Sequence, residues 1–204
     1  MIELIDASLC RGTFCLPETS LTIPSATCGV VTGAAGAGKT SLVEAICGLQ
    51  RIKSGTVKLK GQDVTHATPA DRGVGYLPQD VVLFPDMNVE ANICFGPKLR
   101  GWSKTKMCER IERLATDLEL VDLLPRKPHQ LSGGQQKRVA MARAVALMPD
   151  IVCLDEPFVS LDDHSQTLIR EQLIHLLAEQ SATILVVTHQ PEKLDGISDL
   201  NFQI

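Results

Sequence analysis

The chain has 204 residues, of which 44% are hydrophobic, and this composition excludes an intrinsically disordered protein and fits one globular domain. The formal net charge of −4 gives no overall electrostatic case for binding nucleic acid. No run approaches the roughly 20 uninterrupted apolar residues that cross a bilayer, and the N-terminus lacks the pattern of a secretory signal. We therefore expect a cytosolic chain that does not itself cross a membrane.

The predicted elements begin with short β-branched or alternating runs at 2–5 and 20–23, which indicate a small antiparallel element. A strand at 29–32 follows, and a helix is expected from Lys39 or Thr40 to about Cys47, with Gly48 ending it. Further strands are predicted at 56–59 and 73–77. Between 89 and about 124 apolar residues recur at helical spacing, which indicates a helical insertion.

The alternation then resumes with a helix at 134–147, a strand at 151–154, a helix at 164–179 and a strand at 183–188. Strands that alternate with helices predict an α/β fold with a mainly parallel sheet. We expect a single domain over 1–204, with an α/β core at about 1–88 and 134–204 and a helical subdomain at about 89–133.

Seven cysteines are scattered along the chain, with no C-x-x-C pair among them. An odd number without metal-ligand spacing predicts reduced thiols. Cys28 and Cys153 lie in apolar runs, where a thiol acts as a small hydrophobic side chain.

The segment GAAGAGKT at 33–40 matches the pattern G-x-x-x-x-G-K-[ST] of a phosphate-binding loop. Glycines let backbone N–H groups surround phosphates at the N-terminus of the following helix. Lys39 would bridge the β- and γ-phosphates, and the Thr40 hydroxyl would bind Mg²⁺. A chance glycine-rich turn is the alternative, but a strand enters this loop and a helix leaves it, as a P-loop NTPase core requires. The expected ATP-binding residues are Gly33, Ala34, Ala35, Gly36, Ala37, Gly38, Lys39, Thr40 and Ser41.

Two carboxylates, Asp155 and Glu156, follow the apolar run at 151–154, where the loops of a parallel sheet meet ligands. Asp155 suits a Mg²⁺ shell, and Glu156 is placed to hold or deprotonate an attacking water. Such a pair alone is more often the solvated start of a loop, but the preceding phosphate loop favours the functional interpretation. The sequence LSGGQQ at 131–136 opens a helix with Ser132 as its N-cap, and its paired glycines suggest that an anion approaches the backbone.

LSGGQ together with the phosphate loop resembles the ATP-binding-cassette family, the ATPases of ABC transporters, over nearly the whole chain. YLPQD at 76–80 resembles the family's Q-loop, LDEP at 154–157 its second acidic motif, Leu161-Asp162 its D-loop and Thr188-His189 its switch histidine. The stretch LFPDMNVEANICFG at 83–96 is typical of importer ATPases.

The resemblance implies that ATP is hydrolysed in a head-to-tail dimer and drives solute import through a separate permease, aided by a solute-binding protein, at the cytoplasmic face of the membrane. The catalytic residues would be Glu156, His189 and Gln79. The Mg²⁺ ligands would be Thr40, Gln79 and Asp155. The residues that contact the partner's ATP would be Ser132, Gly133, Gly134 and Gln135, and Asp162 of the D-loop would cross the dimer.

Two places depart from the family pattern. The aromatic residue that usually stacks on adenine falls near Cys10 or Arg11, so either the planar Arg11 guanidinium or Phe14 would take that role. The D-loop has Val159-Ser160 where the family commonly has Ser-Ala.

Two other functions compete with transport. A soluble ABC ATPase acting on ribosomes or DNA would usually carry two cassettes or a coiled-coil insertion, and neither occurs in this sequence. A nucleotide-gated module without turnover is disfavoured because Lys39, Gln79, Glu156 and His189 are all retained.

Overall fold

The computed structural model describes residues 1–12 and 14–204. Its N-terminal part forms a four-stranded antiparallel sheet in the order β2-β1-β4-β5. The four strands are β1 (Ile2–Arg11), β2 (Phe14–Ile23), β4 (Ser54–Leu59) and β5 (Gln62–Asp63). The antiparallel element is therefore confirmed, but its hairpin strands are longer than predicted. Register shifts around Ala7 break the alternation from which strand length was inferred.

A five-stranded parallel sheet forms the centre of the molecule, in the order β6-β7-β8-β3-β9. All its neighbouring strands are parallel. The strands are β3 (Cys28–Thr32), β6 (Gly75–Leu77), β7 (Ile151–Asp155), β8 (Thr183–Val187) and β9 (Leu200–Gln203). The edge strand β9 was not predicted.

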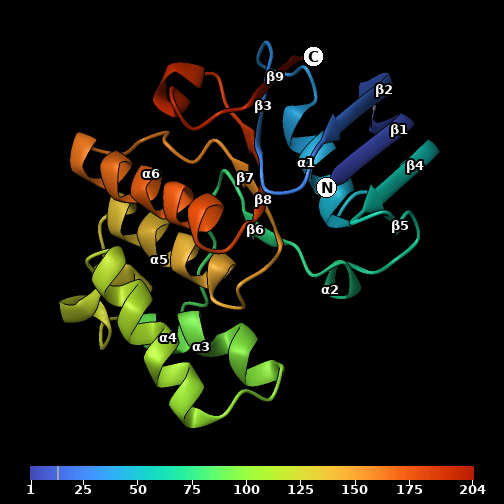
Figure 1. Ribbon diagram of the computed structural model, residues 1–204. Helices are drawn as coiled ribbons and strands as arrows, with labels where there is room; N and C mark the ends of the chain where they lie inside the picture. Colours follow the sequence, from blue (N-terminus) through green and yellow to red (C-terminus); the bar gives the residue numbers. More distant parts are fainter. Residues whose placement is uncertain (13) are drawn as a thin grey trace.

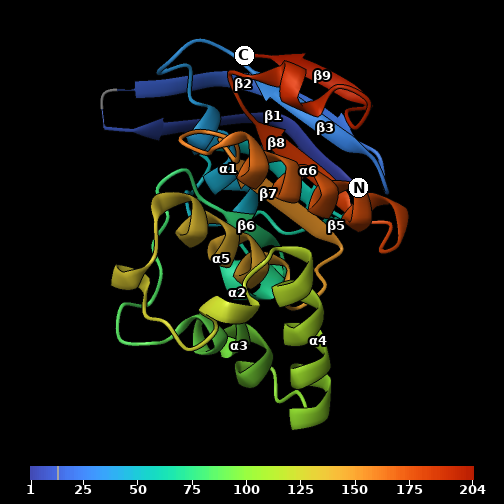
Figure 2. The same ribbon diagram turned by 90° about the vertical axis from the view of Figure 1, so that its left-hand side faces the viewer.

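Helices cover this sheet and extend away from it. The longer ones are α1 (Lys39–Cys47), α3 (Val89–Leu99), α4 (Lys104–Asp117), α5 (Gly133–Val145) and α6 (Asp163–Ala178). The short ones are α2 (Pro69–Arg72), η1 (Val121–Leu123), η2 (Pro128–Gln130) and η3 (Pro191–Leu194). Figures 1 and 2 place α3 and α4 at the end of the molecule opposite the antiparallel sheet. None of the helices in the described ranges has the length and hydrophobicity needed to cross a membrane.

The parallel sheet separates two hydrophobic cores, because successive side chains of a strand point to opposite faces. In β7, Val152 and Leu154 pack into the core that also contains residues of α3 to α6. Ile151 and Cys153 pack on the other face, into the core shared with α1 and the antiparallel sheet. The two cores fix the central strands from both sides.

The prediction that all seven cysteines are reduced was wrong for Cys10 and Cys15, which form a disulfide. The hairpin register places these residues directly opposite each other, with their Cα atoms 4.1 Å apart. Their spacing along the sequence fits no metal or redox motif, so the pairing becomes visible only when the register of the hairpin is known. The free cysteines are Cys28, Cys47, Cys94, Cys108 and Cys153.

Candidate functional site

A cleft of about 710 Å³ opens at the carboxyl edge of the parallel sheet. The segments after β3, β6, β7 and β8 all reach it, because parallel strands end at one edge. The cleft is lined by Arg11, Phe14, Ala35, Gly36, Gly38, Lys39, Thr40, Ser41, Gln79, Asp155, Glu156, Val159 and His189. Most of the residues predicted from separate motifs therefore meet in one place.

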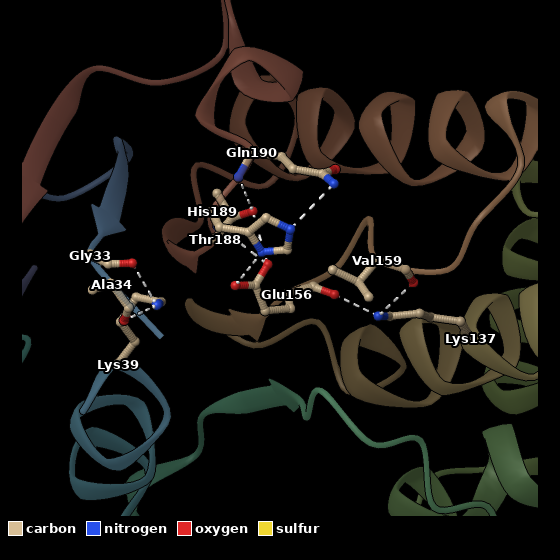
Figure 3. Close-up of polar contacts among 9 residues, drawn as sticks. All are labelled: Gly33, Ala34, Lys39, Lys137, Glu156, Val159, Thr188, His189 and Gln190. Atoms are coloured by element: carbon tan, nitrogen blue, oxygen red, sulfur yellow. Dashed lines mark hydrogen bonds and ion pairs between the residues drawn. The ribbon is translucent and has the colours of Figure 1, made fainter. Parts of the chain in front are cut away.

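The predicted phosphate loop connects β3 to α1. Gly36 and Gly38 have φ values of 79° and 97°, a left-handed region in which residues with a Cβ atom are strained. The Lys39 ammonium donates hydrogen bonds to the carbonyl oxygens of Gly33 and Ala34, at 2.8 Å and 3.0 Å (Figure 3). Lys39 thus folds over the loop and lies at its mouth. Gly33, Ala34 and Ala37 belong to the loop but do not line the cleft.

Asp155 ends β7 and is fully buried, and neither of its carboxylate oxygens has a hydrogen-bond partner in the described part of the chain. Burial raises the pKa of the Asp155 carboxyl, and the neighbouring Thr40 hydroxyl and Lys39 ammonium oppose that rise. A buried carboxylate beside a hydroxyl, with both oxygens unpaired, provides the hard oxygen ligands that a small divalent cation prefers. The donor set therefore fits Mg²⁺.

The Glu156 side chain is only 8% exposed and contacts the segment that follows β8. One carboxylate oxygen lies 3.0 Å from Nδ1 of His189. The other accepts a hydrogen bond from the Thr188 hydroxyl at 3.1 Å. Figure 3 shows these three side chains facing one another. The structure thus joins two residues that the sequence analysis placed in different motifs, and it adds Thr188, whose contact was not predicted.

Lys137 is a second feature that the sequence analysis missed. It lies on α5, is 4% exposed, and its ammonium donates a hydrogen bond to the Glu156 backbone carbonyl at 2.5 Å. A signal was present in the sequence, because Lys137 lies one helical turn before the buried Met141 and so falls on the apolar face of its helix.

The predicted signature residues lie at the start of α5 and are held there by a capping box. The Ser132 hydroxyl accepts a hydrogen bond from the Gln135 N–H at 3.2 Å, and the Gln135 side chain accepts one from the Ser132 N–H at 2.9 Å. Among the described residues, the stretch 132–135 contributes nothing to the lining of the cleft. It lies next to the predicted D-loop instead: a Cβ atom added to Gly134 would be 3.6 Å from Asp162. Asp162 is the N-cap of α6.

Both residues considered for stacking on a base lie at the cleft. The Arg11 guanidinium is 2.9 Å from the Glu44 carboxylate of α1. The Phe14 ring packs on the phosphate loop, where a Cβ atom added to Gly38 would be 2.8 Å from it. The end of the β1–β2 hairpin therefore supplies both candidates for stacking on the base.

Comparisons with known proteins identify relatives of this chain. The chain is 40% identical over 170 residues to the molybdate/tungstate import ATP-binding protein WtpC of Thermococcus kodakarensis, covering 83% of this chain and 52% of that protein. It is 37% identical over 199 residues to the sulfate/thiosulfate import ATP-binding protein CysA of Synechococcus elongatus, covering 97% of this chain and 58% of that protein. The chain thus spans about half the length of the curated relatives it matches.

A solved structure has the same fold. It is the dimeric structure of an ATP-binding cassette in a post-hydrolysis state, bound to ADP and Pi, with a TM-score of 0.86 and 26% identity. The match covers 95% of this chain and 90% of that one. The predicted α/β fold with a P-loop NTPase core is thereby confirmed. The family model described as "ABC transporter" matches residues 16–159, more than half of the sequence, and the chain therefore belongs to the ABC transporter family.

Proposed function

We propose that this chain binds and hydrolyses ATP with Mg²⁺ in a head-to-tail dimer, and that hydrolysis drives solute import through a separate permease. The observation that carries the proposal is the meeting of Lys39, Asp155, Glu156 and His189 at one cleft. Lys39 would supply a cation that binds the phosphates, and Asp155 a metal ligand. Glu156 would supply the base, with His189 as its polar partner.

Binding depends on the phosphate loop. Its backbone N–H groups, at the N-terminus of α1, would surround the phosphates, and Lys39 would exchange its two loop carbonyls for phosphate oxygens. Thr40, Gln79 and Asp155 would hold Mg²⁺, which when bound neutralises charge on the phosphates. The unpaired Asp155 carboxylate supports this assignment.

Glu156 is proposed as the general base. Its carboxylate is fixed by Thr188 and His189, so a water at the cleft would meet a base in a defined orientation. The half-exposed His189 ring would then be free to contact the terminal phosphate. Gln79, on the segment after β6, lines the cleft and would help to hold the water.

The transport assignment draws on the relatives, whose names describe ATP-binding proteins of import systems. By this proposal the chain sits at the cytoplasmic face of the membrane against permease subunits, and a solute-binding protein delivers the solute to them. In proteoliposomes that contain this chain and its permease, ATP-driven uptake should be lost when Lys39 is replaced by alanine.

The base is tested with a Glu156→Gln variant. We expect it to bind ATP with nearly wild-type affinity but to hydrolyse it at least about 100-fold more slowly, because the amide cannot accept the proton. A Lys39→Ala variant should lose affinity as well. Glu109→Gln, changed at an exposed carboxylate of α4, is the matched control and should hydrolyse normally. Wild-type turnover by Glu156→Gln would remove Glu156 from the base role.

A further inference from the structure

Lys137 connects the helix that begins with the signature to the loop that carries Glu156. Its ammonium donates to the Glu156 carbonyl at 2.5 Å and lies 3.5 Å from the Val159 carbonyl (Figure 3). It therefore holds the two ends of one turn. Lys137 does not reach the cleft and is not among the described residues that line it.

The turn held by Lys137 has an unusual backbone. Glu156 has a φ of 49° and Ser160 a φ of 62°, both in the left-handed region, which is strained for residues other than glycine. The bond inside the turn, from the Val159 N–H to the Glu156 carbonyl, is 3.4 Å long. Such a conformation persists only when its surroundings fix it. The Glu156 N–H donates to the Val187 carbonyl of β8 at 2.8 Å, and the Lys137 ammonium supplies the charged hydrogen bond on the carbonyl side of the same residue.

Burying an ammonium is costly unless it is well paired. Burial lowers the pKa of Lys137, while the negative charges of Glu156, Asp155 and Asp80 oppose that shift. A second buried cation lies on the same helix. The neighbouring Arg138, 8% exposed, donates to the Leu118 carbonyl at 2.7 Å, just after the end of α4 and away from the cleft. Lys137 therefore binds the backbone that carries the proposed base, whereas Arg138 binds the backbone at the end of α4.

We propose that Lys137 is a positioning residue: by holding the Glu156 and Val159 carbonyls it orients the Glu156 peptide, and through it the carboxylate that faces His189. This inference rests on the proposed function, because it assigns a role toward the Glu156 base. It also connects the signature end of α5 to the base in the same chain, so a displacement of α5 would be transmitted to the turn.

The test compares Lys137→Met, which removes every donor, with Lys137→Arg, which keeps the charge and the donors. Arg138→Met is the matched control for the loss of a buried cation. For each variant kcat, KM, the affinity for a fluorescent ATP analogue and the melting temperature are measured. We expect Lys137→Met to lower kcat about tenfold or more, with KM and nucleotide affinity changed less than about threefold, since one charge-assisted hydrogen bond behind the base is lost.

Lys137→Arg should recover most of that loss, and Arg138→Met should lower the melting temperature while kcat stays near wild type. If Lys137→Met does not fold, Lys137→Gln takes its place. The glutamine side chain keeps a donor, but it is uncharged and one bond shorter than that of lysine. Equal kcat in Lys137→Met and wild type, or equal kcat losses in Lys137→Met and Arg138→Met, would overturn the positioning role. Failure of the proposed function is distinguishable, because wild type and Glu156→Gln would then hydrolyse ATP at the same rate.

Discussion

Asp155 shows at the scale of one residue how a binding site opposes stability. Its carboxyl is fully buried and neither oxygen has a partner among the described residues. Burial raises the pKa above that of the unfolded chain, so the folded state loses stability as the pH rises through this range. The loss is the cost of ionising a buried carboxylate.

Replacing Asp155 by asparagine should therefore raise the melting temperature of the nucleotide-free protein at pH 7, because a neutral amide costs less to bury than an unpaired charge. The same variant should lose the extra stabilisation that ATP gives in the presence of Mg²⁺, because the metal ligand is gone. Thermal scans with and without Mg²⁺ and ATP measure both effects. A lower melting temperature without nucleotide would contradict the assignment of an unpaired, desolvated charge. Asp163→Asn, changed at an exposed carboxylate on α6, is the control.

At the scale of the element, the β1–β2 hairpin carries Arg11 and Phe14 to the cleft, and the Cys10–Cys15 disulfide closes it immediately beside them. The two cysteines are 5 residues apart in sequence, and a loop of this size predicts a stabilisation of about 2 kcal/mol from the reduced entropy of the unfolded chain.

We expect a reducing agent to lower the free energy of unfolding by up to about 2 kcal/mol and to weaken nucleotide binding, because the hairpin end that holds Arg11 and Phe14 loosens. Urea titration with and without a phosphine reductant measures the first effect, and nucleotide titration the second. A Cys10→Ser, Cys15→Ser double variant should have the lower free energy of unfolding even without reductant, and adding reductant should not change it. If reductant destabilises this variant as much as wild type, the effect does not come from the disulfide.

Elements with a strong local signal were predicted well. The helix that starts after the phosphate loop ends at Cys47 as expected, and Gly48 has the left-handed φ of 81° that ends it. Elements that depend on a distant partner were missed. β5 has two residues and exists only through its pairing with β4. β9 is a half-exposed strand that pairs with the edge of β3. Neither has a periodicity of its own to predict it.

For the molecule as a whole, the sequence identified the motifs but not their contacts. Lys39 and Asp155 were assigned from local patterns and His189 from the family resemblance, and their meeting follows from the strand order β7-β8-β3. The contact of Thr188 with Glu156 and that of Lys137 with the same residue join elements far apart in the chain. They depend on how β8 and α5 pack against β7, which no local pattern determines.

The last prediction concerns the proposed division of the candidate site between two chains. Within one chain, the signature residues lie away from the cleft that holds Lys39. In the proposed head-to-tail pair, the signature of each copy would complete the site of the other, so the pair would contain two such sites. Gly133 is a suitable position for a variant, because a Cβ atom added to it meets nothing within 4 Å in the described structure. Gly133→Asp should fold normally and repel the phosphates of the partner's ATP.

We expect Lys39→Ala and Gly133→Asp chains to be inactive separately and active when mixed. A mixed dimer collects both changes in one site and leaves the other intact, so an equal mixture should reach about a quarter of the wild-type rate, since half of randomly formed dimers are mixed. A mixture of Lys39→Ala with a chain that carries both substitutions contains no intact site and is the control. If the first mixture is no more active than this control, the signature acts on the nucleotide of its own chain, and the head-to-tail arrangement is wrong.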